Sequence, residues 1–394
     1  MQKKILFIGH DANFAGAQYL LLHLLRYLKT VEGIKTMLLL GAGGKLEADF
    51  EEVTEVVYWE ENDAAKVENG YLSKIVRASR LEPFLTNTKN KETAQNKIED
   101  FDPDFIFSNT IANGDLLIKL SYLKKPFFIY CHEMEKSIKT YTTHENLDYQ
   151  LKNAEYILTG SKAVKQNLID SHQVSDQKIE VYNSYIDCKA MEMEYQSVDK
   201  QEVIKKLKLG ESPIIIGGCG LTEWRKGIDI FINTALQVQN STTQNVHFVW
   251  VGINKKSEDY YHLMYDLQRM GIADKVHLIE GSENIIEYTA CFDLFFMSSR
   301  EDPYPLVMIE AGLNKIPVVC FDKSGGAVDF VGEITELKIP YLDILKASEK
   351  IVELIENQQK REKLGEIFYQ KAWQHDITVR GPQILNKILE LKEI

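Results

Sequence analysis

The 394-residue sequence lacks several features that would place it in a large class of proteins. No apolar run approaches the roughly 20 residues that a helix needs to cross a bilayer. The apolar run after the basic pair at the start is too short for a signal peptide, so it is expected to be a first strand. Basic residues are not in excess: the formal net charge is −12, which argues against general nucleic-acid binding. We therefore expect a cytoplasmic protein without a nucleic-acid partner.

Cysteine motifs are also missing. The five cysteines are scattered singly, no C-x-x-C occurs, and no spacing typical of a metal site is present. Cys131, Cys219 and Cys320 lie in apolar, strand-like runs, which predicts buried thiols in a reducing compartment. What remains is an ordinary globular composition, 44% hydrophobic and 26% charged. A single core stops growing at about 250–300 residues, so the length indicates two domains.

Short apolar runs alternate with amphipathic stretches along most of the chain. This rhythm predicts two doubly wound α/β domains, residues 1–187 and 212–375. Residues 188–211 lose the rhythm and are rich in charge, so we expect a linker there. The last segment, 376–394, is expected to contain a helix from Pro382 that crosses back to the first domain. The predicted strands are residues 5–9, 35–40, 53–59, 105–108, 127–131, 156–160, 179–182, 214–220, 247–251, 276–279, 294–297 and 318–321.

Polar residues follow several predicted strands of the first domain, and ligands of open α/β sheets bind outside the carboxyl ends of strands. Gly16 opens a predicted helix after the first strand, and Asn109 follows the strand at 105–108. His132 and Glu133 follow the strand at 127–131. Ser161 follows the next strand, where helix capping alone would explain it. A lone histidine can equally be structural, so both interpretations of His132 stay open.

The most informative stretch is 297–329, where an apolar strand leads through a polar turn into a helix near Pro305. Proline has a fixed φ and no N–H, which suits a first helical turn. Such a helix N-terminus attracts anions through its free N–H groups and its dipole. Asp302 on the loop and Glu310 in the helix, with seven residues between them, bracket this terminus. Carboxylates there suit the hydroxyl groups of a sugar, although a loop cap and a solvated helix residue would give the same spacing.

Two glycine-bearing loops accompany this stretch. Gly325 and Gly326 follow the next predicted strand and mark a turn where backbone can approach a ligand closely. Gly220 ends the first strand of the second domain, and Arg225 and Lys226 follow it in the same loop. The loop therefore offers two cations at a strand end, unless Arg225 only pairs with the nearby glutamate of the same loop.

These features resemble the donor-site signature of family 4 glycosyltransferases, which are retaining enzymes with the GT-B fold. That pattern has two glutamates separated by seven residues, then a strand and a Gly-Gly turn; here Asp302 stands for the first glutamate. The loop from Gly220 resembles the family's phosphate loop, with Leu221 where an arginine is usual and Arg225 beside Lys226. The resemblance covers nearly the whole chain. It implies GT-B architecture: two Rossmann-like, doubly wound parallel-sheet domains facing across a cleft.

The resemblance implies a retaining glycosyltransferase that moves a sugar from a UDP- or GDP-linked donor to a saccharide or lipid-linked acceptor, in surface polysaccharide or glycoconjugate assembly. The implied catalytic set has Arg225 and Lys226 clamping the diphosphate, Glu310 on the ribose, Asp302 on the sugar hydroxyls and His132 lining the sugar pocket. The residues expected around the donor are Gly16, Gly220, Arg225, Lys226, Gly252, Asp302, Pro305, Leu306, Glu310, Gly325 and Gly326. Those expected toward the acceptor are Gly16, Asn109, Glu133 and Ser161.

No metal or other cofactor is expected. Two cations and helix N-termini can stabilise the departing diphosphate without one, and we expect no Asp-x-Asp motif, the carboxylate pair used by metal-dependent transferases. Two rival functions remain open on the same fold. One is a sugar phosphorylase or nucleotide-sugar hydrolase, and the other is a non-catalytic subunit that binds a nucleotide sugar.

Residues 72–97 differ from the rest of this acidic chain. They carry six basic side chains and two acidic ones, a balance of +4, with apolar residues interleaved in the first part. A basic amphipathic segment can lie on an anionic membrane, which would place the protein peripherally at the inner membrane face. The alternative is a solvated outer helix.

Overall fold

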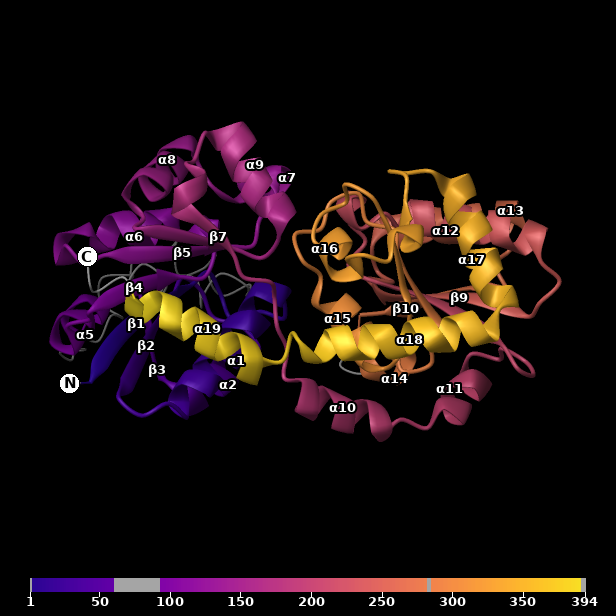
Figure 1. The fold of residues 1–394 in the computed structure, drawn as a ribbon, viewed down its shortest axis with the longest axis horizontal. Helices are drawn as coiled ribbons and strands as arrows, with labels where there is room; N and C mark the ends of the chain where they lie inside the picture. The colour runs from indigo at the N-terminus through magenta and orange to yellow at the C-terminus, as the bar shows by residue number, and fades with distance from the viewer. Residues whose placement is uncertain (1, 60–92, 282–284, 391–394) are drawn as a thin grey trace, which may run out of the picture. The chain divides into compact units, whose positions relative to one another are not determined.

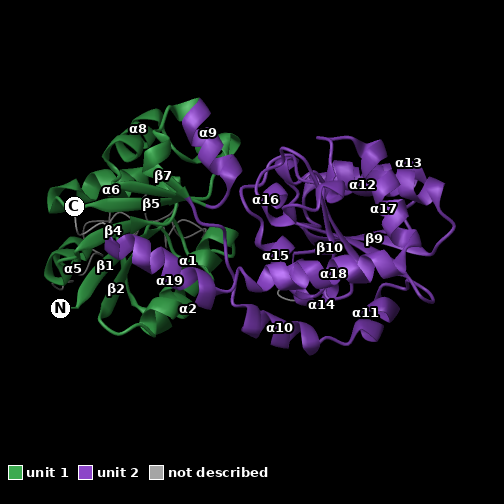
Figure 2. Cartoon of the chain, in the orientation of Figure 1, with its two compact units in different colours: residues 1–159, 171–180 green, residues 160–170, 181–394 purple. Residues whose placement is uncertain are grey.

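The computed structural model describes residues 2–59, 93–281 and 285–390 (Figure 1). They form two units (Figure 2). Unit 1 comprises Met1–Thr159 with Ser171–Glu180, and unit 2 comprises Gly160–Asp170 with Val181–Ile394. Each unit is built on one parallel sheet with helices packed around it, which confirms the predicted α/β class with two Rossmann-like domains. Most of the basic segment 72–97 lies outside the described residues.

Unit 1 contains a seven-stranded sheet in the order β3-β2-β1-β4-β5-β6-β7. Its strands are continuous apolar runs because a parallel sheet is covered on both faces; residues 5–8 of the first strand, for example, are fully buried. All seven strands predicted for this part of the chain are present. They are β1 (Lys3–Gly9), β2 (Ile34–Leu40), β3 (Glu55–Tyr58), β4 (Phe105–Ser108), β5 (Phe127–Cys131), β6 (Tyr156–Thr159) and β7 (Ile179–Val181).

The helices of unit 1 follow the amphipathic pattern of the sequence. In α1 the face formed by Leu21, Leu24, Leu25 and Leu28 is buried, as its spacing predicts. The last helix, α9, begins in unit 2 and ends in unit 1. The helical segments are α1 (Gly16–Lys29), α2 (Glu47–Val53), α5 (Ala94–Phe101), η3 (Ile111–Asn113), α6 (Gly114–Lys119), η4 (Leu120–Leu123), α7 (Glu135–Tyr141), α8 (His144–Asn153), α9 (Lys162–His172) and η5 (Asp176–Lys178).

Unit 2 contains a six-stranded sheet in the order β10-β9-β8-β11-β12-β13. The strand order reverses between β8 and β11, and in such sheets ligands bind outside the carboxyl ends of the strands at this switch point. The predicted strands are all present, and the two-residue β13 was not foreseen. They are β8 (Ile214–Cys219), β9 (Val246–Ile253), β10 (Val276–Glu280), β11 (Leu294–Met297), β12 (Val318–Phe321) and β13 (Lys338–Ile339).

The segment 188–211 is helical and belongs to unit 2, in contrast to the expected linker. Asp187 caps α10 by accepting from the N–H of Ala190, and Asp199 caps α11. The charges that suggested a linker are therefore helix caps and exposed helix faces. The helical segments of unit 2 after α9 are α10 (Cys188–Gln196), α11 (Lys200–Lys206), η6 (Trp224–Lys226), α12 (Ile228–Ser241), α13 (Glu258–Met270), α14 (Ile285–Thr289), α15 (Leu306–Leu313), α16 (Ala327–Val331), η7 (Thr335–Leu337), α17 (Ile344–Glu356), α18 (Gln358–Trp373) and α19 (Ile377–Glu390).

The last helix begins earlier than predicted. α19 starts at Ile377, and Pro382, expected in its first turn, lies inside it. Asp376 starts the helix: its side chain accepts from the N–H of Thr378, at 2.8 Å, and its carbonyl accepts from the N–H of Arg380. A capping aspartate thus determines the start, because a capped N–H outweighs the preference of proline for the first turn. Within the described ranges, none of the helices combines the length and apolar content that crossing a membrane requires.

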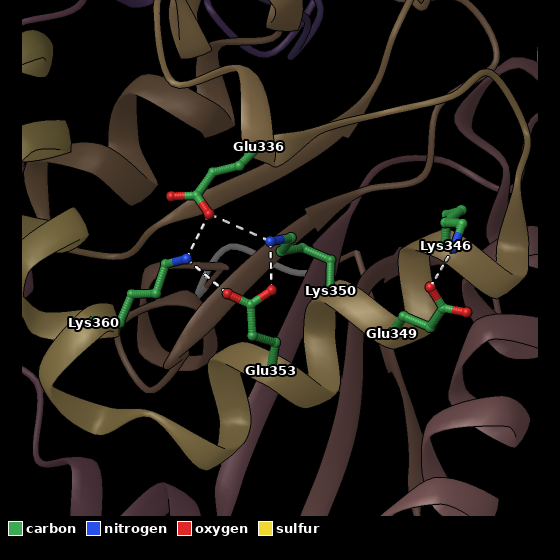
Figure 3. A network of polar contacts seen from close by, with 6 residues as sticks. All are labelled: Glu336, Lys346, Glu349, Lys350, Glu353 and Lys360. Atoms are coloured by element: carbon green, nitrogen blue, oxygen red, sulfur yellow. Dashed lines mark hydrogen bonds and ion pairs between the residues drawn. The ribbon is translucent and has the colours of Figure 1, made fainter.

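A network of charged side chains ties η7, α17 and α18 together (Figure 3). Lys360 contacts Glu336 at 2.5 Å and Glu353 at 2.7 Å, and Lys350 contacts the same two carboxylates at 3.4 and 2.5 Å. Hydrogen bonds from these lysines lower the pKa of both glutamates. The side chains are partly exposed, so the network is a modest stabilising feature of the outer layer.

Candidate functional site

Glycines bring the loops at the carboxyl edge of the unit 2 sheet together. Gly227 has φ +69, and a Cβ there would lie 2.1 Å from the carbonyl oxygen of Ser298. Gly252 has φ +119, and a Cβ there would lie 2.5 Å from the carbonyl oxygen of Gly220. Only glycine permits these approaches. The ends of β8, β9 and β11 are therefore packed backbone against backbone around the switch point.

Two cations meet one carboxylate at this point. The Lys226 Nζ lies 2.5 Å from Asp302 Oδ2, and the Arg225 Nη1 lies 3.6 Å from the same oxygen. The side chains of Lys226 and Asp302 are only 14% and 7% exposed. Arg225 Nε also contacts Glu223, at 2.7 Å, so the pairing considered as an alternative exists beside the contact with Asp302. The structure thus brings three of the predicted residues together within unit 2.

The Gly-Gly turn positions the carboxylate loop. The Asp302 N–H donates to the carbonyl of Ser324, and the Gly326 N–H donates to the carbonyl of Asp302, at 2.8 and 3.0 Å. A Cβ on Gly325 would lie 2.0 Å from that carbonyl oxygen. The close approach inferred from the two glycines is therefore an approach to the loop that carries Asp302. Pro305 is the N-cap of α15, and Leu306 is its first residue.

Glu310 projects from α15 into a partly buried environment. Burial, and after it the charge of Glu194, raises its pKa to about 7. Among the residues that the structure describes, none donates a hydrogen bond to this carboxylate. Its charge in turn adds to burial in raising the pKa of Cys219 and Tyr195, which places Glu310 beside the end of β8 and α10. Because Glu310 is only partly buried, its carboxylate oxygens stay open to donors from outside the described residues, such as the hydroxyl groups of a ligand.

Sequence reasoning passed over Arg300, which lies between β11 and Asp302. Its guanidinium forms a bidentate pair with Asp229, at 2.9 and 2.6 Å, and donates to the Trp224 carbonyl at 2.8 Å. The signal in the sequence was weak, because an arginine beside acidic residues in a turn is commonly a solvated surface group.

In unit 1, two predicted residues each keep an unmatched buried polar atom at adjacent strand ends. Asn109 donates to the carbonyl of Ala17 at 2.7 Å, while its Oδ1 has no partner among the described residues. The His132 ring packs 4.0 Å from that of Tyr130, and its Nε2 likewise has none. Burial lowers the pKa of His132 to about 3, so its imidazole is neutral. Gly16 is the exposed first residue of α1.

The other two predicted acceptor residues already have structural roles. The buried Glu133 carboxylate accepts from the Thr110 hydroxyl and from the N–H groups of Ile111 and His132. It fastens the loop after β4 to the end of β5, and burial raises its pKa. Ser161 caps α9 by accepting from the Val164 N–H at 3.2 Å. Contact of either residue with an acceptor stays a prediction.

Within the described ranges, no three His, Cys, Asp or Glu side chains gather so that they could hold a metal ion. The expectation that the chain has no Asp-x-Asp motif is wrong, because the pattern occurs at residues 100–104 of unit 1. Asp102 pairs with Lys125 at 2.8 Å, and Asp104 accepts from the Lys4 N–H at 2.9 Å. These carboxylates lie before β4, at the amino end of the strand, and their partners are structural. The five cysteines are all free and buried, which confirms the expectation for the three in strands.

Comparison with known proteins gives partial matches in sequence. Residues 199–371 match the family described as Glycosyl transferases group 1. The amylovoran biosynthesis glycosyltransferase AmsD of Erwinia amylovora is 22% identical over 148 residues, 35% of this chain and 40% of that protein. The alpha-galactosylglucosyldiacylglycerol synthase of Streptococcus pneumoniae is 25% identical over 134 residues, 32% of this chain and 34% of that protein. The matched parts thus span well under half of both relatives.

Solved structures match over nearly the full length. Anabaena Alr3699/HepE in complex with UDP has a TM-score of 0.75 at 18% identity, covering 98% of this chain and 100% of that one. Its complex with UDP-glucose has a TM-score of 0.73 at 19% identity, covering 98% and 99%. WaaG, a glycosyltransferase of lipopolysaccharide biosynthesis, has a TM-score of 0.64 at 12% identity, covering 96% and 98%. These likenesses confirm the predicted fold, the GT-B fold of glycosyltransferases.

Proposed function

We propose that this protein is a retaining glycosyltransferase that moves a sugar from a nucleotide-diphosphate sugar to a saccharide or lipid-linked acceptor. The observation that carries the proposal is the convergence of Arg225 and Lys226 on Asp302 at the switch point of the unit 2 sheet. These residues lie in the segment that matches the glycosyltransferase family. The names of the two relatives, one for amylovoran and one for a glycolipid, support surface polysaccharide or glycoconjugate assembly as the setting.

In this proposal the donor diphosphate replaces the Asp302 carboxylate as the partner of Lys226 and Arg225. Lys226 and Arg225 would turn from Asp302 to phosphate oxygens, which accept charge-assisted hydrogen bonds from both kinds of cation. The Asp302 carboxylate would then be released to accept from the hydroxyls of the donor sugar. Glu310, which has acceptor oxygens without described donors, would bind the ribose hydroxyls in the same way.

The same cations would serve the chemical step. The diphosphate gains negative charge as the glycosidic bond breaks, so positive groups fixed beside it stabilise the transition state more than the ground state. The N-terminus of α15, next to Asp302, adds its dipole. We propose that these groups suffice without a metal ion. In unit 1, neutral His132 and the free Oδ1 of Asn109 would contact sugar hydroxyls.

The proposal is tested by measuring which nucleotide the protein releases and what release requires. UDP-glucose is the first donor to try, because HepE was solved with UDP and with UDP-glucose. The expected result is release of UDP or GDP only with a saccharide or lipid acceptor, and a product that keeps the donor's anomeric configuration by NMR. Release without acceptor would indicate a hydrolase, and formation of a sugar phosphate would indicate a phosphorylase. A donor-induced rise in melting temperature without turnover on any acceptor would indicate a binding subunit.

A further inference from the structure

We infer that Arg300, paired with Asp229, is a positioning residue that fixes Arg225 and Lys226 for the reaction. The inference rests on the proposed function. Arg300 follows β11 in a loop, yet its side chain is only 14% exposed. Its guanidinium meets both carboxylate oxygens of Asp229 and packs over the Trp224 ring, 5.1 Å from the centroid. A planar fork makes such a contact, and a lysine ammonium cannot reproduce it.

The loop of Arg300 binds three consecutive carbonyls of the turn that carries the cations. The Arg300 guanidinium donates to the carbonyl of Trp224 at 2.8 Å. The backbone N–H of Arg300 donates to the carbonyl of Arg225, at 2.8 Å, and the Ser298 hydroxyl donates to that of Lys226, at 3.2 Å. This turn, η6, is a three-residue 3₁₀ segment. Such short segments have weak internal hydrogen bonds, here from the Lys226 and Gly227 N–H groups at 2.9 and 3.3 Å, so the external donors add to what holds the turn.

The same loop also carries Asp302, two residues after Arg300. The hydrogen bonds between this loop and the turn 224–226 therefore position both Lys226 and Asp302, the two partners of the ion pair. Asp229 completes it from the first turn of α12, and the Tyr341 hydroxyl donates to the Arg300 carbonyl at 3.2 Å. Since its guanidinium is engaged by Asp229 and Trp224, Arg300 acts through its neighbours.

Fixed cations are what the proposed step needs. Charge stabilisation is effective when the groups are already in place as charge develops, and a displacement of about 1 Å can lower the rate about 100-fold. Arg300→Ala is therefore expected to lower kcat about 100-fold, with a smaller change in donor KM because cations in a loosened turn can still reach the diphosphate. Arg300→Lys keeps the charge and loses the fork, so it should retain part of kcat. Asp229→Asn should lie between Arg300→Lys and the wild type.

A matched control is available in unit 2. Arg361 also donates to backbone carbonyls, those of Leu354 and Ile355 at 2.7 Å, at the end of α17. Arg361→Ala should lower the melting temperature without changing kcat or KM. The experiment measures kcat, donor KM, calorimetric affinity for UDP-glucose and melting temperature for the wild type, these four single variants and the double variant Arg300→Ala with Asp229→Asn. The expected result is a fall in kcat that is largest for Arg300→Ala, smaller for Arg300→Lys and smallest for Asp229→Asn. Arg361→Ala should show no such fall.

The outcomes separate the inference from the function on which it rests. A wild type that neither turns over nor binds a nucleotide sugar refutes the proposed function. An active wild type whose Arg300→Ala variant keeps kcat, as Arg361→Ala does, overturns the inference alone. So does a double variant, Arg300→Ala with Asp229→Asn, that is clearly worse than Arg300→Ala, because Asp229 is inferred to act only through Arg300. If Arg300→Ala fails to fold, wild-type kcat in both Arg300→Lys and Asp229→Asn overturns the inference, and reduced kcat at unchanged melting temperature supports it.

Discussion

Replacing Glu310 with glutamine is expected to stabilise the fold above neutral pH while weakening the binding of a nucleotide sugar. The substitution keeps the shape of the side chain and removes its charge. In the wild type the carboxylate is partly buried on α15, and no described group donates a hydrogen bond to it. Burial first, and then the charge of Glu194, raises its pKa from the ordinary 4.5 to about 7. The fold therefore holds a partly buried carboxylate that receives no hydrogen bond from the described residues.

The size of this effect follows from the pKa. Each unit of difference in pKa between the folded and unfolded states corresponds to about 1.36 kcal/mol, so the ionised carboxylate destabilises the fold by at most about 3.4 kcal/mol. Between pH 4.5 and 7 the folded state holds a proton that the unfolded chain has released, so stability falls as pH rises through this window. Above pH 7 the full penalty applies. Glutamine does not ionise, so the variant should escape the penalty and gain stability at pH 8.5 but not below pH 4.5.

The affinity for a nucleotide sugar should rise with pH, whereas the stability of the fold falls. Ribose hydroxyls would donate to the Glu310 carboxylate, which favours the ionised form, so binding near pH 7 should release a proton. Wild-type affinity should rise from pH 5.5 to 8 and then level off. A hydrogen bond to a charged group contributes about 1.5–3 kcal/mol, so the variant should bind roughly 10- to 150-fold more weakly at pH 8. UDP-glucose is a suitable probe because its diphosphate does not titrate in this range.

The assay combines urea denaturation at pH 5.5 and 8.5 with calorimetry in buffers of different protonation enthalpy. Glu194→Gln serves as the control: Glu194 is exposed, it contributes only the second cause of the shift, and its loss should leave affinity nearly unchanged. Equal pH dependence of stability in wild type and Glu310→Gln, together with equal affinity for UDP-glucose, would refute the reasoning. Glu310 would then be an ordinary helix residue.

Three further predictions concern the cations, the metal and the membrane. Lys226→Ala and Arg225→Ala should each lower kcat about 100- to 1000-fold, with smaller effects on nucleotide affinity; near wild-type turnover of the second would mean that Arg225 only serves Glu223. EDTA should leave turnover intact, and activity lost to EDTA and restored by Mg²⁺ or Mn²⁺ would count against a metal-independent site. Residues 72–97 should bind anionic vesicles in a sedimentation assay, with an attraction of about 1 kcal/mol for each basic residue near the membrane surface. Equal binding to neutral vesicles, or binding that survives charge reversal of the segment, would show that it is a solvated surface.

Much of the fold could be predicted because parallel strands are buried on both faces and appear as uninterrupted apolar runs. The strands predicted at 105–108 and 127–131 have the same bounds in the structure. Residues 188–211 could not be placed in this way. Each of the two helices there buries few residues, and what starts them is a single capping aspartate in a segment rich in charge.

The residues of the candidate site also differ in how far the sequence could predict them. Asp302 and Glu310 are linked by a local spacing at a helix N-terminus, so the sequence itself points to both. Lys226 lies 76 residues from Asp302, and only the resemblance to a known family implied that the two share a site. Arg300 could not be found, because its partners lie 71 and 76 residues away in the sequence and no spacing links them. The charge state of Glu310 was equally hidden, since it depends on what surrounds the carboxylate and on the donors that are missing from that environment.

The loop from Gly220 to Lys226 differs from the phosphate-loop pattern that it resembles, and the structure offers a physical explanation. Leu221, where an arginine is usual, is 61% exposed and brings no charge. In the proposed function the second cation is Arg225, whose Nη1 lies 3.6 Å from Asp302 Oδ2. A cation on a short turn is effective only if the turn is held, and the Arg225 carbonyl accepts from the N–H groups of both Arg300 and Glu301, at 2.8 and 3.3 Å. A cation at Arg225, at the end of the loop, in place of one at Leu221, near its start, thus depends on these hydrogen bonds to the Arg225 carbonyl. The prediction for Arg225 and the inference for Arg300 therefore test the same turn. If Arg225→Ala keeps its turnover, the hydrogen bonds to the Arg225 carbonyl should affect the rate only by positioning Lys226.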